Sequence, residues 1–216
     1  MALRAARLIL CLVVLVACST GEPTASTTSQ QPVLAESLLT VGDLRSAAVT
    51  GRLAEEDVNE AGWVANPDPR GPCGARGLAA FDPAAFPESE IVILLTEDFT
   101  ILHLVLRTDD AAGRIDAVQG DAVPGCEVFL TDTPSGIPQM NRMVALIDLD
   151  ALGDDRIGWW SIIGPEGTDI RIVGQTALVA VGRTISMIQI LSENEHGVDL
   201  LRRLAEIATE KLRNAG

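Results

Sequence analysis

The sequence contains few of the residues, and none of the common motifs, on which enzyme chemistry depends. Only two histidines, His103 and His196, occur among its 216 residues. The patterns Gly-x-Ser-x-Gly, Gly-x-x-x-x-Gly-Lys, His-Glu-x-x-His and Gly-x-Gly-x-x-Gly are absent, and with them the usual hydrolase, nucleotide and zinc signatures. His103 lies between two leucines, as buried or edge histidines do, and His196 lies in a polar segment that favours capping or solvation. We therefore predict a non-enzymatic protein, since an enzyme would need one of these histidines beside an acid in a cleft.

Basic residues are also scarce. The chain has 16 Lys and Arg against 30 Asp and Glu, a formal charge of −14, and Lys211 is the one lysine among the 16. Nucleic-acid affinity comes from Lys and Arg that displace counterions, so we expect no nucleic-acid partner. Anionic lipid headgroups should repel the chain as well. The preference for Arg over Lys is typical of high-GC genomes, such as those of actinobacteria.

The apolar run near the N-terminus is too short to cross a membrane. Leu8 to Ala17 supplies ten residues, whereas a transmembrane helix needs about 20. Two arginines and no acid precede the run, which is the layout of an export signal. Leu15-Val16-Ala17-Cys18 resembles the lipobox of bacterial lipoproteins, which implies removal of residues 1–17 and attachment of acyl chains such as palmitate to Cys18. An ordinary secretory signal, with Cys18 incidental, is the alternative.

Lipidation of Cys18 would place the chain on the extracytoplasmic face of the cell membrane, held by its N-terminal lipid. The signal carries two arginines and no acid, so its loss changes the formal charge from −14 to −16. We expect residues 18–36 to form a flexible linker, because Ser19 to Gln31 contains no large apolar residue. Residues 37–216 suit one domain and are short for two.

Cysteine usage points to one disulfide. Cys11 leaves with the signal and Cys18 carries the lipid, so Cys73 and Cys126 remain in an oxidising compartment. A metal site is the alternative, but neither cysteine has a histidine or a third cysteine near it in sequence. We expect no metal and no cofactor.

Residue periodicity predicts an α+β fold, an antiparallel sheet of about six strands with helices packed on it. Thr40 and Asp43 form a capping pair at the start of one helix, and Gly182-Arg183 suits a type II′ hairpin turn. Five prolines near residues 62–86 predict a long loop there. The predicted helices cover residues 41–48, 109–121 and 198–212. The predicted strands cover residues 91–95, 101–106, 127–132, 143–149, 157–163, 170–181 and 184–191.

Two acidic or glycine-rich segments invite a functional interpretation. Residues 148–155 begin like a calcium loop, but Leu152 replaces an oxygen ligand and Trp159 replaces the closing acid. A turn with capping acids is the simpler interpretation. Arg76, in the Pro-Cys-Gly-Ala-Arg-Gly segment at 72–77, is a candidate ligand contact, because its side chain and nearby backbone amides could bind an anion together. Glycines that shape the loop around a disulfide explain the same pattern.

Trp159 and Trp160 are the most informative aromatic residues. Adjacent strand residues face opposite sides of a sheet, so one tryptophan belongs to the core and the other lies under a helix or lines a surface or cleft. The chain has seven aromatic residues in all, which makes the second tryptophan a candidate ligand contact. Plain packing is the alternative.

The order and spacing of several short segments resemble a known family. These segments are "LLTVGDL", "GPCG", "PGC", the Leu-Gly-Asp-Asp turn before a Trp-bearing strand, "VAVGRTISMIQIL" and "DLLRRLAEIATEKL", and they cover about residues 37–213. The family is the extracytoplasmic sensor domain of mycobacterial PknH-like Ser/Thr kinases, which is also found in actinobacterial lipoproteins. The resemblance implies an antiparallel sheet with flanking helices and a groove for an extracellular ligand. The kinase-attached version carries two disulfides, whereas Cys73 and Cys126 permit one.

The leading hypothesis is therefore a lipid-anchored, non-enzymatic sensor or ligand-binding domain whose extracellular ligand or envelope partner is unknown. A surface interaction or structural lipoprotein without a small ligand is the alternative. A concave apolar groove with a tryptophan in its wall would favour the first. A flat exposed apolar patch would favour the second.

Overall fold

The structure is a computed structural model, and it describes residues 31–56, 69–70, 86–121, 128–131, 139–165, 167–169, 171–194 and 197–215. Its described strands form one sheet in the order β1-β3-β4-β9-β8-β7-β6-β5-β2, and every pairing is antiparallel. The strands are β1 (Ala54–Glu56), β2 (Pro69–Arg70), β3 (Ser89–Leu95), β4 (Phe99–Arg107), β5 (Val128–Thr131), β6 (Gln139–Ile147), β7 (Asp155–Pro165), β8 (Ile172–Val181) and β9 (Thr184–Ser192).

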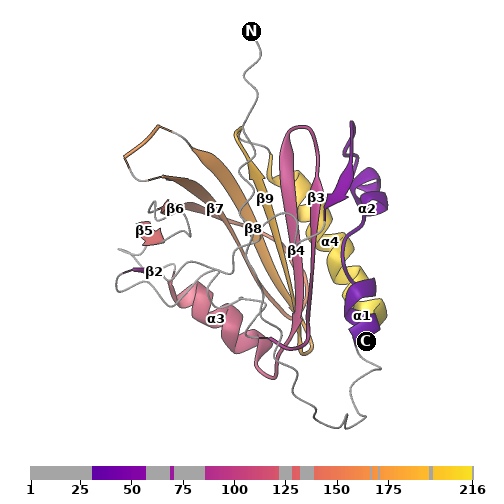
Figure 1. Cartoon of the computed structure of the whole chain (residues 1–216). Helices are drawn as coiled ribbons and strands as arrows, with labels where there is room; N and C mark the ends of the chain where they lie inside the picture. Colours follow the sequence, from indigo (N-terminus) through magenta and orange to yellow (C-terminus); the bar gives the residue numbers. More distant parts are fainter. Residues whose placement is uncertain are drawn as a thin grey trace, which may run out of the picture.

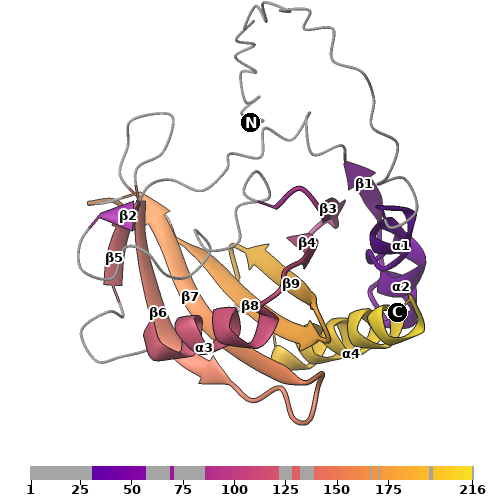
Figure 2. The same ribbon diagram turned by 90° about the horizontal axis from the view of Figure 1, so that it is seen from below.

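Helices cover both faces of the sheet (Figures 1 and 2). α4 (Val198–Ala215) packs on β8 and β9, and α1 (Gln31–Glu36) and α2 (Val41–Ser46) lie beside it. α3 (Ala111–Asp121) packs on β7 and β8 from the other side. We call the two sides the α4 face and the α3 face. The arrangement confirms the predicted α+β class.

The central strands supply apolar side chains to both faces. In β8, Ala177 and Val179 lie in the core under α4, whereas Leu178 and Ala180 lie in the core that includes α3. Successive strand residues point to opposite faces, so an uninterrupted apolar run needs cover on both sides. The run at the end of β8 has that cover.

The predicted helices form where their patterns indicate. α4 buries the expected apolar stripe of Leu201, Leu204, Ala205, Ala208 and Leu212. At α2, the Thr40 side chain accepts from the Asp43 amide and the Asp43 side chain accepts from the Thr40 amide, which completes a capping box. α3 begins two residues later than predicted and ends at the predicted residue.

The acidic turn at residues 148–155 holds strands together. Gly153 has φ +62°, and a β-carbon there would lie 2.3 Å from the Ala180 carbonyl oxygen. Asp154 accepts a hydrogen bond of 2.7 Å from the Gly182 amide in the β8–β9 turn. Gly182 itself has φ +58°, as a type II′ turn requires at that position. The acids therefore brace two turns, in keeping with the turn interpretation.

Three sequence-based expectations need correction. The sheet has more than six strands, because β1 and β2 are too short to show periodicity. Pro69 pairs with Thr131 inside the predicted loop, which proline tolerates because β2 is an edge strand. The domain also begins before residue 37, since α1 starts at Gln31 and buries Leu34 against Val105 and Leu212.

No helix in the described part of the chain is long and apolar enough to span a membrane.

Candidate functional site at Trp160

The two adjacent tryptophans of β7 have different environments. Trp159 is 6% exposed and belongs to the core on the α3 face. Trp160 points to the α4 face, where part of its ring packs against the core under α4 and the rest lines a groove. The prediction that one tryptophan is core and the other lines a surface or cleft is confirmed.

The groove at Trp160 is apolar and open. It has a volume of about 230 Å³ and runs over β6, β7 and β8. Its lining residues are Val144, Ala145, Trp160, Ser161, Ile162 and Val173. No charged side chain is among them, so the groove offers dispersion contacts and apolar burial to whatever occupies it.

Four large apolar side chains are exposed in the described chain, and one of them, Val144, lines this groove. In β6, Val144 is 56% exposed and Leu146 is 62% exposed. Met140 in β6 and Ile172 at the start of β8 complete the set of large hydrophobic residues that are exposed in the described chain. Scattered exposed apolar residues are ordinary. By strand register Leu146 and Ile172 face the α3 side, so Val144 is the one of these four that lines the groove.

A bulge in β6 gives the groove its shape. Met143 pairs with Ser161 and Ala145 pairs with Trp160, so Val144 is an extra residue without a partner in β7. A bulge re-aims the side chains that follow it. Ala145 therefore shares the α4 face with Trp160, and Leu146 shares the α3 face with Trp159.

The outer edge of β6 is only partly used. β5 pairs with Gln139 to Arg142, and none of the described strands pairs with Met143 to Ile147 on that side. An unpaired edge can accept an added strand. The Trp160 groove and this edge therefore lie on the same stretch of β6.

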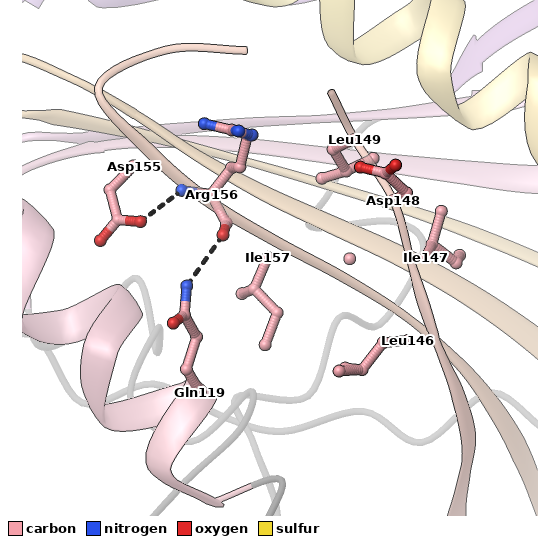
Figure 3. A pocket seen from close by; sticks show the side chains of 9 residues that line it. Gln119, Leu146, Ile147, Asp148, Leu149, Asp155, Arg156 and Ile157 are labelled. Atoms are coloured by element: carbon pink, nitrogen blue, oxygen red, sulfur yellow. Dashed lines mark hydrogen bonds between the residues drawn. The ribbon is translucent and has the colours of Figure 1, made fainter. Parts of the chain in front are cut away.

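A second cavity lies on the α3 face, behind the same pair of strands (Figure 3). It has a volume of about 570 Å³ and is lined by residues of α3, β6 and β7. Gln119 of α3 reaches across and donates 3.0 Å to the Arg156 carbonyl oxygen. The acids in its wall serve the backbone, because Asp148 accepts from the Asp150 amide and Asp155 from the Arg156 amide. Among the described residues of this wall, no acid is paired with a base.

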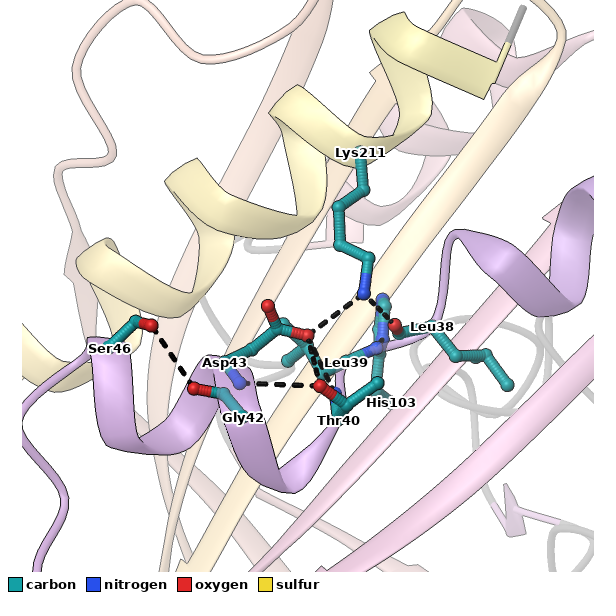
Figure 4. A network of polar contacts seen from close by, with 8 residues as sticks. All are labelled: Leu38, Leu39, Thr40, Gly42, Asp43, Ser46, His103 and Lys211. Atoms are coloured by element: carbon teal, nitrogen blue, oxygen red, sulfur yellow. Dashed lines mark hydrogen bonds and ion pairs between the residues drawn. The ribbon is translucent and has the colours of Figure 1, made fainter.

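His103 is a structural residue (Figure 4). Its side chain is fully buried, and Nδ1 accepts 2.9 Å from the Leu39 amide, which leaves Nε2 to donate 2.9 Å to the Ser186 hydroxyl. Burial lowers the pKa of His103 to about 3, and the charge of Lys211 adds to that effect while Asp43 opposes it. The imidazole is therefore neutral at physiological pH and lines neither cavity. The expectation of a buried histidine is confirmed.

Lys211 and Asp43 connect α4 to α2 beside His103. Lys211 Nζ lies 2.9 Å from Asp43 Oδ2 and also donates to the Leu38 carbonyl oxygen. Burial acts to raise the pKa of Asp43, but hydrogen bonds from Lys211 and Thr40 outweigh it and hold the pKa below its ordinary value. This network fixes α2 and α4 to β4.

The other candidate residues lie outside the described part of the chain. They are the lipidation residue Cys18, the disulfide pair Cys73 and Cys126, the ligand candidate Arg76, and His196. Their roles stay predictions. Within the described ranges, no group of three or more His, Cys, Asp or Glu side chains is placed to hold a metal ion.

Sequence reasoning missed Val144 and Leu146. The run Met143-Val144-Ala145-Leu146-Ile147 reads as an ordinary apolar strand, and exposure depends on which elements cover it. The one available signal was that both faces of this strand are apolar while few helices are predicted to cover them.

Comparison with known proteins identifies the fold. The chain is similar to the extracellular domain of PknH from Mycobacterium tuberculosis, with a TM-score of 0.59 and 10% identity, over 85% of this chain and 96% of that one. It also matches an uncharacterized Mycobacterium smegmatis protein, an orthologue of Rv0999, with a TM-score of 0.43 and 12% identity, over 83% of this chain and 96% of that one. No family model and no curated sequence matches. The first similarity confirms the fold implied by the sequence resemblance.

Proposed function

We propose that this protein is a lipid-anchored, extracytoplasmic, non-enzymatic domain that binds an aliphatic ligand in the groove at Trp160. The observation that carries the proposal is the apolar groove over β6, β7 and β8, in which the exposed Val144 lies beside the partly buried Trp160. The groove is smaller than the roughly 300–1,000 Å³ of sites for drug-sized ligands. It therefore suits a single alkyl chain.

The fold supports the extracytoplasmic and non-enzymatic parts of the proposal. The similar PknH domain is extracellular, and an exported lipoprotein would occupy the same side of the membrane. His103, the one histidine in the described ranges, is buried between Leu39 and Ser186 and has no acid as its hydrogen-bond partner. A ligand-binding role needs no such pair.

The ligand site can be tested with a neutral alkyl probe and two matched variants. Octyl glucoside, kept below its micellar concentration, should bind the full chain and raise its melting temperature. Val144→Asp places a charge in the groove wall and should weaken binding about tenfold or more, because the carboxylate would lose water when the alkyl chain binds. Leu146→Asp puts the same charge on the same strand but on the α3 face, and it should leave binding unchanged. Equal binding by wild type and Val144→Asp would contradict the proposal.

The lipid anchor has its own test. Cys18→Ala should release the protein from the membrane fraction, because the thiol that receives the acyl chains is gone. Cys11→Ala is the matched control and should change nothing, since that residue is removed with the signal. Unaltered membrane fractionation of Cys18→Ala would exclude the anchor while leaving the groove untouched.

The open edge of β6 favours a second candidate, a protein partner that adds a strand beside Met143 to Ile147. An added strand would contact side chains on both faces of β6. This candidate therefore predicts that Val144→Asp and Leu146→Asp both weaken binding of the partner, whereas the aliphatic-ligand candidate predicts loss with Val144→Asp alone.

A further inference from the structure

A third cavity, far from β6, collects arginines in a chain that is otherwise strongly acidic. Its volume is about 510 Å³. Arg107 comes from the end of β4, Arg183 from the β8–β9 turn and Arg213 from the last turn of α4. None of the described residues that line it is acidic, although acids outnumber basic residues 30 to 16 in the chain.

Most of the rest of the cavity wall is apolar, and Ser37 and Thr184 are its polar members. Leu34 from α1, Val181 from β8 and Leu212 from α4 lie together at its base, and Leu34 and Leu212 are buried. Gly182 and Thr184 complete the wall at the β8–β9 turn. The cavity therefore combines cationic side chains with an apolar floor, which suits an anion attached to an apolar group.

Two of the arginines already have carboxylate partners that a ligand can replace. Arg107 lies 3.3 Å from Glu88, whose side chain is 40% exposed, and Arg183 contacts Asp109, whose side chain is 86% exposed. Such exposed ion pairs contribute little to stability. A phosphate that accepts paired hydrogen bonds from guanidinium groups forms stronger contacts than these. A phosphate can therefore compete with these carboxylates for the guanidinium groups.

We infer that this cavity binds a phosphate-bearing ligand, with the phosphate between the guanidinium groups of Arg107, Arg183 and Arg213 and an apolar part against Leu34, Val181 and Leu212. The shared chemistry is a phosphate ester. A membrane phospholipid headgroup and a soluble phosphate ester both provide it.

The position of α1 favours the headgroup as the source, and this part rests on the proposed lipid anchor. Figure 1 shows α1 and the C-terminal end of α4 at the same end of the sheet as the β8–β9 turn. Gln31, the first residue of α1, follows Cys18 by 13 residues, a span that a flexible chain covers in about 18–22 Å. The cavity is then the part of the domain nearest to the lipid along the chain. Negative charge elsewhere would turn the remaining surface away from anionic headgroups.

The test uses the full chain and a charge-matched pair of double variants. Arg183→Gln/Arg213→Gln removes two cavity arginines, and Arg171→Gln/Arg203→Gln removes two exposed arginines that do not line the cavity. In neutral detergent at constant ionic strength, glycerol 3-phosphate should raise the melting temperature of wild type and of the control by about 3 °C or more at saturation. The cavity variant should lose at least half of that rise.

A second arm separates the two sources. The same three proteins are reconstituted into phosphatidylcholine vesicles with and without phosphatidylglycerol. A rise in melting temperature with phosphatidylglycerol, lost in the cavity variant, supports the headgroup. A response to glycerol 3-phosphate alone supports a soluble ester, and a rise in neither arm, or equal rises in both double variants, overturns the inference. Failure of the Cys18 anchor would leave the glycerol 3-phosphate arm intact, so the two failures are distinguishable.

Discussion

Strands β8 and β6 are both rich in apolar residues and belong to one sheet, yet their side chains differ sharply in exposure. Leu178 in β8 is fully buried, between strands that carry helices on both faces, whereas Leu146 in β6 is 62% exposed. The same residue type therefore stabilises the fold in one strand and remains available in the other. Of the side chains that β6 leaves uncovered, Val144 lines the Trp160 groove, whereas Leu146 lies on the other face of the sheet.

The largest expected difference between the two strands is in the free energy of unfolding, and a matched pair of leucine substitutions measures it. Leu178→Ala should lower the free energy of unfolding by about 2–5 kcal/mol, because it leaves a cavity in a packed core. Leu146→Ala should change it by less than about 0.5 kcal/mol, as exposed substitutions usually do. Urea titration measures both. A loss of similar size in the two variants would mean that β6 is covered in solution.

The next effect is the acid sensitivity of the covered region, by which we mean the central strands β4, β9 and β8 with the helices packed on them. His103 has a pKa of about 3 in the fold and about 6.5 when unfolded. Below pH 6.5 the unfolded chain therefore gains a proton that the folded chain cannot accept. The free energy of unfolding should fall by about 1 kcal/mol for each unit of pH between 6.5 and 4.5 from this group.

The variant His103→Gln isolates that contribution. Glutamine does not titrate, so the fall between pH 6.5 and 4.5 should be about 2 kcal/mol smaller in the variant than in wild type. Its stability at pH 7 will be lower because the Leu39 and Ser186 contacts change. The slope against pH decides the matter, and parallel slopes in the two proteins would show that His103 is accessible to protons in the fold.

A smaller effect concerns the end of the covered region at α2. Thr40→Ala removes the hydroxyl that accepts from the Asp43 amide and should cost about 1 kcal/mol. Thr40→Ser keeps the hydroxyl and should restore most of that loss. Thermal unfolding of the three proteins provides the measurement, and no difference between the alanine and serine variants would show that the cap contributes nothing.

Local patterns in the sequence accounted for most of the elements of the covered region. The stripe of α4, the Thr40–Asp43 cap and the Gly182 turn each depend on residues within one turn or hairpin, so their signals survive without knowledge of the fold. β1 and β2 could not be found, because strands of three and two residues show no alternation. The start of the domain at α1 was missed because Leu34 is a single leucine in a polar segment. Its main partners, Val105 of β4 and Leu212 of α4, lie far away in the sequence.

The candidate sites depend on neighbours far away in the chain, and there the sequence was less informative. It separated Trp159 from Trp160 by strand alternation. It could not show that Val144 sits in a bulge beside Trp160 or that Arg107, Arg183 and Arg213 line one cavity, because those facts depend on strand register and helix packing. The bridge between Cys73 and Cys126 stays a prediction, which peptide mapping without reductant would check.

The most direct test of the central claim is the fluorescence of Trp160 during titration with octyl glucoside. An alkyl chain over the exposed part of the ring should shift the emission to shorter wavelength. The account predicts that this shift persists in Trp159→Phe, whose altered residue is in the opposite core, and disappears in Trp160→Phe. A shift that persists in Trp160→Phe would place the ligand elsewhere and contradict the groove as the binding site.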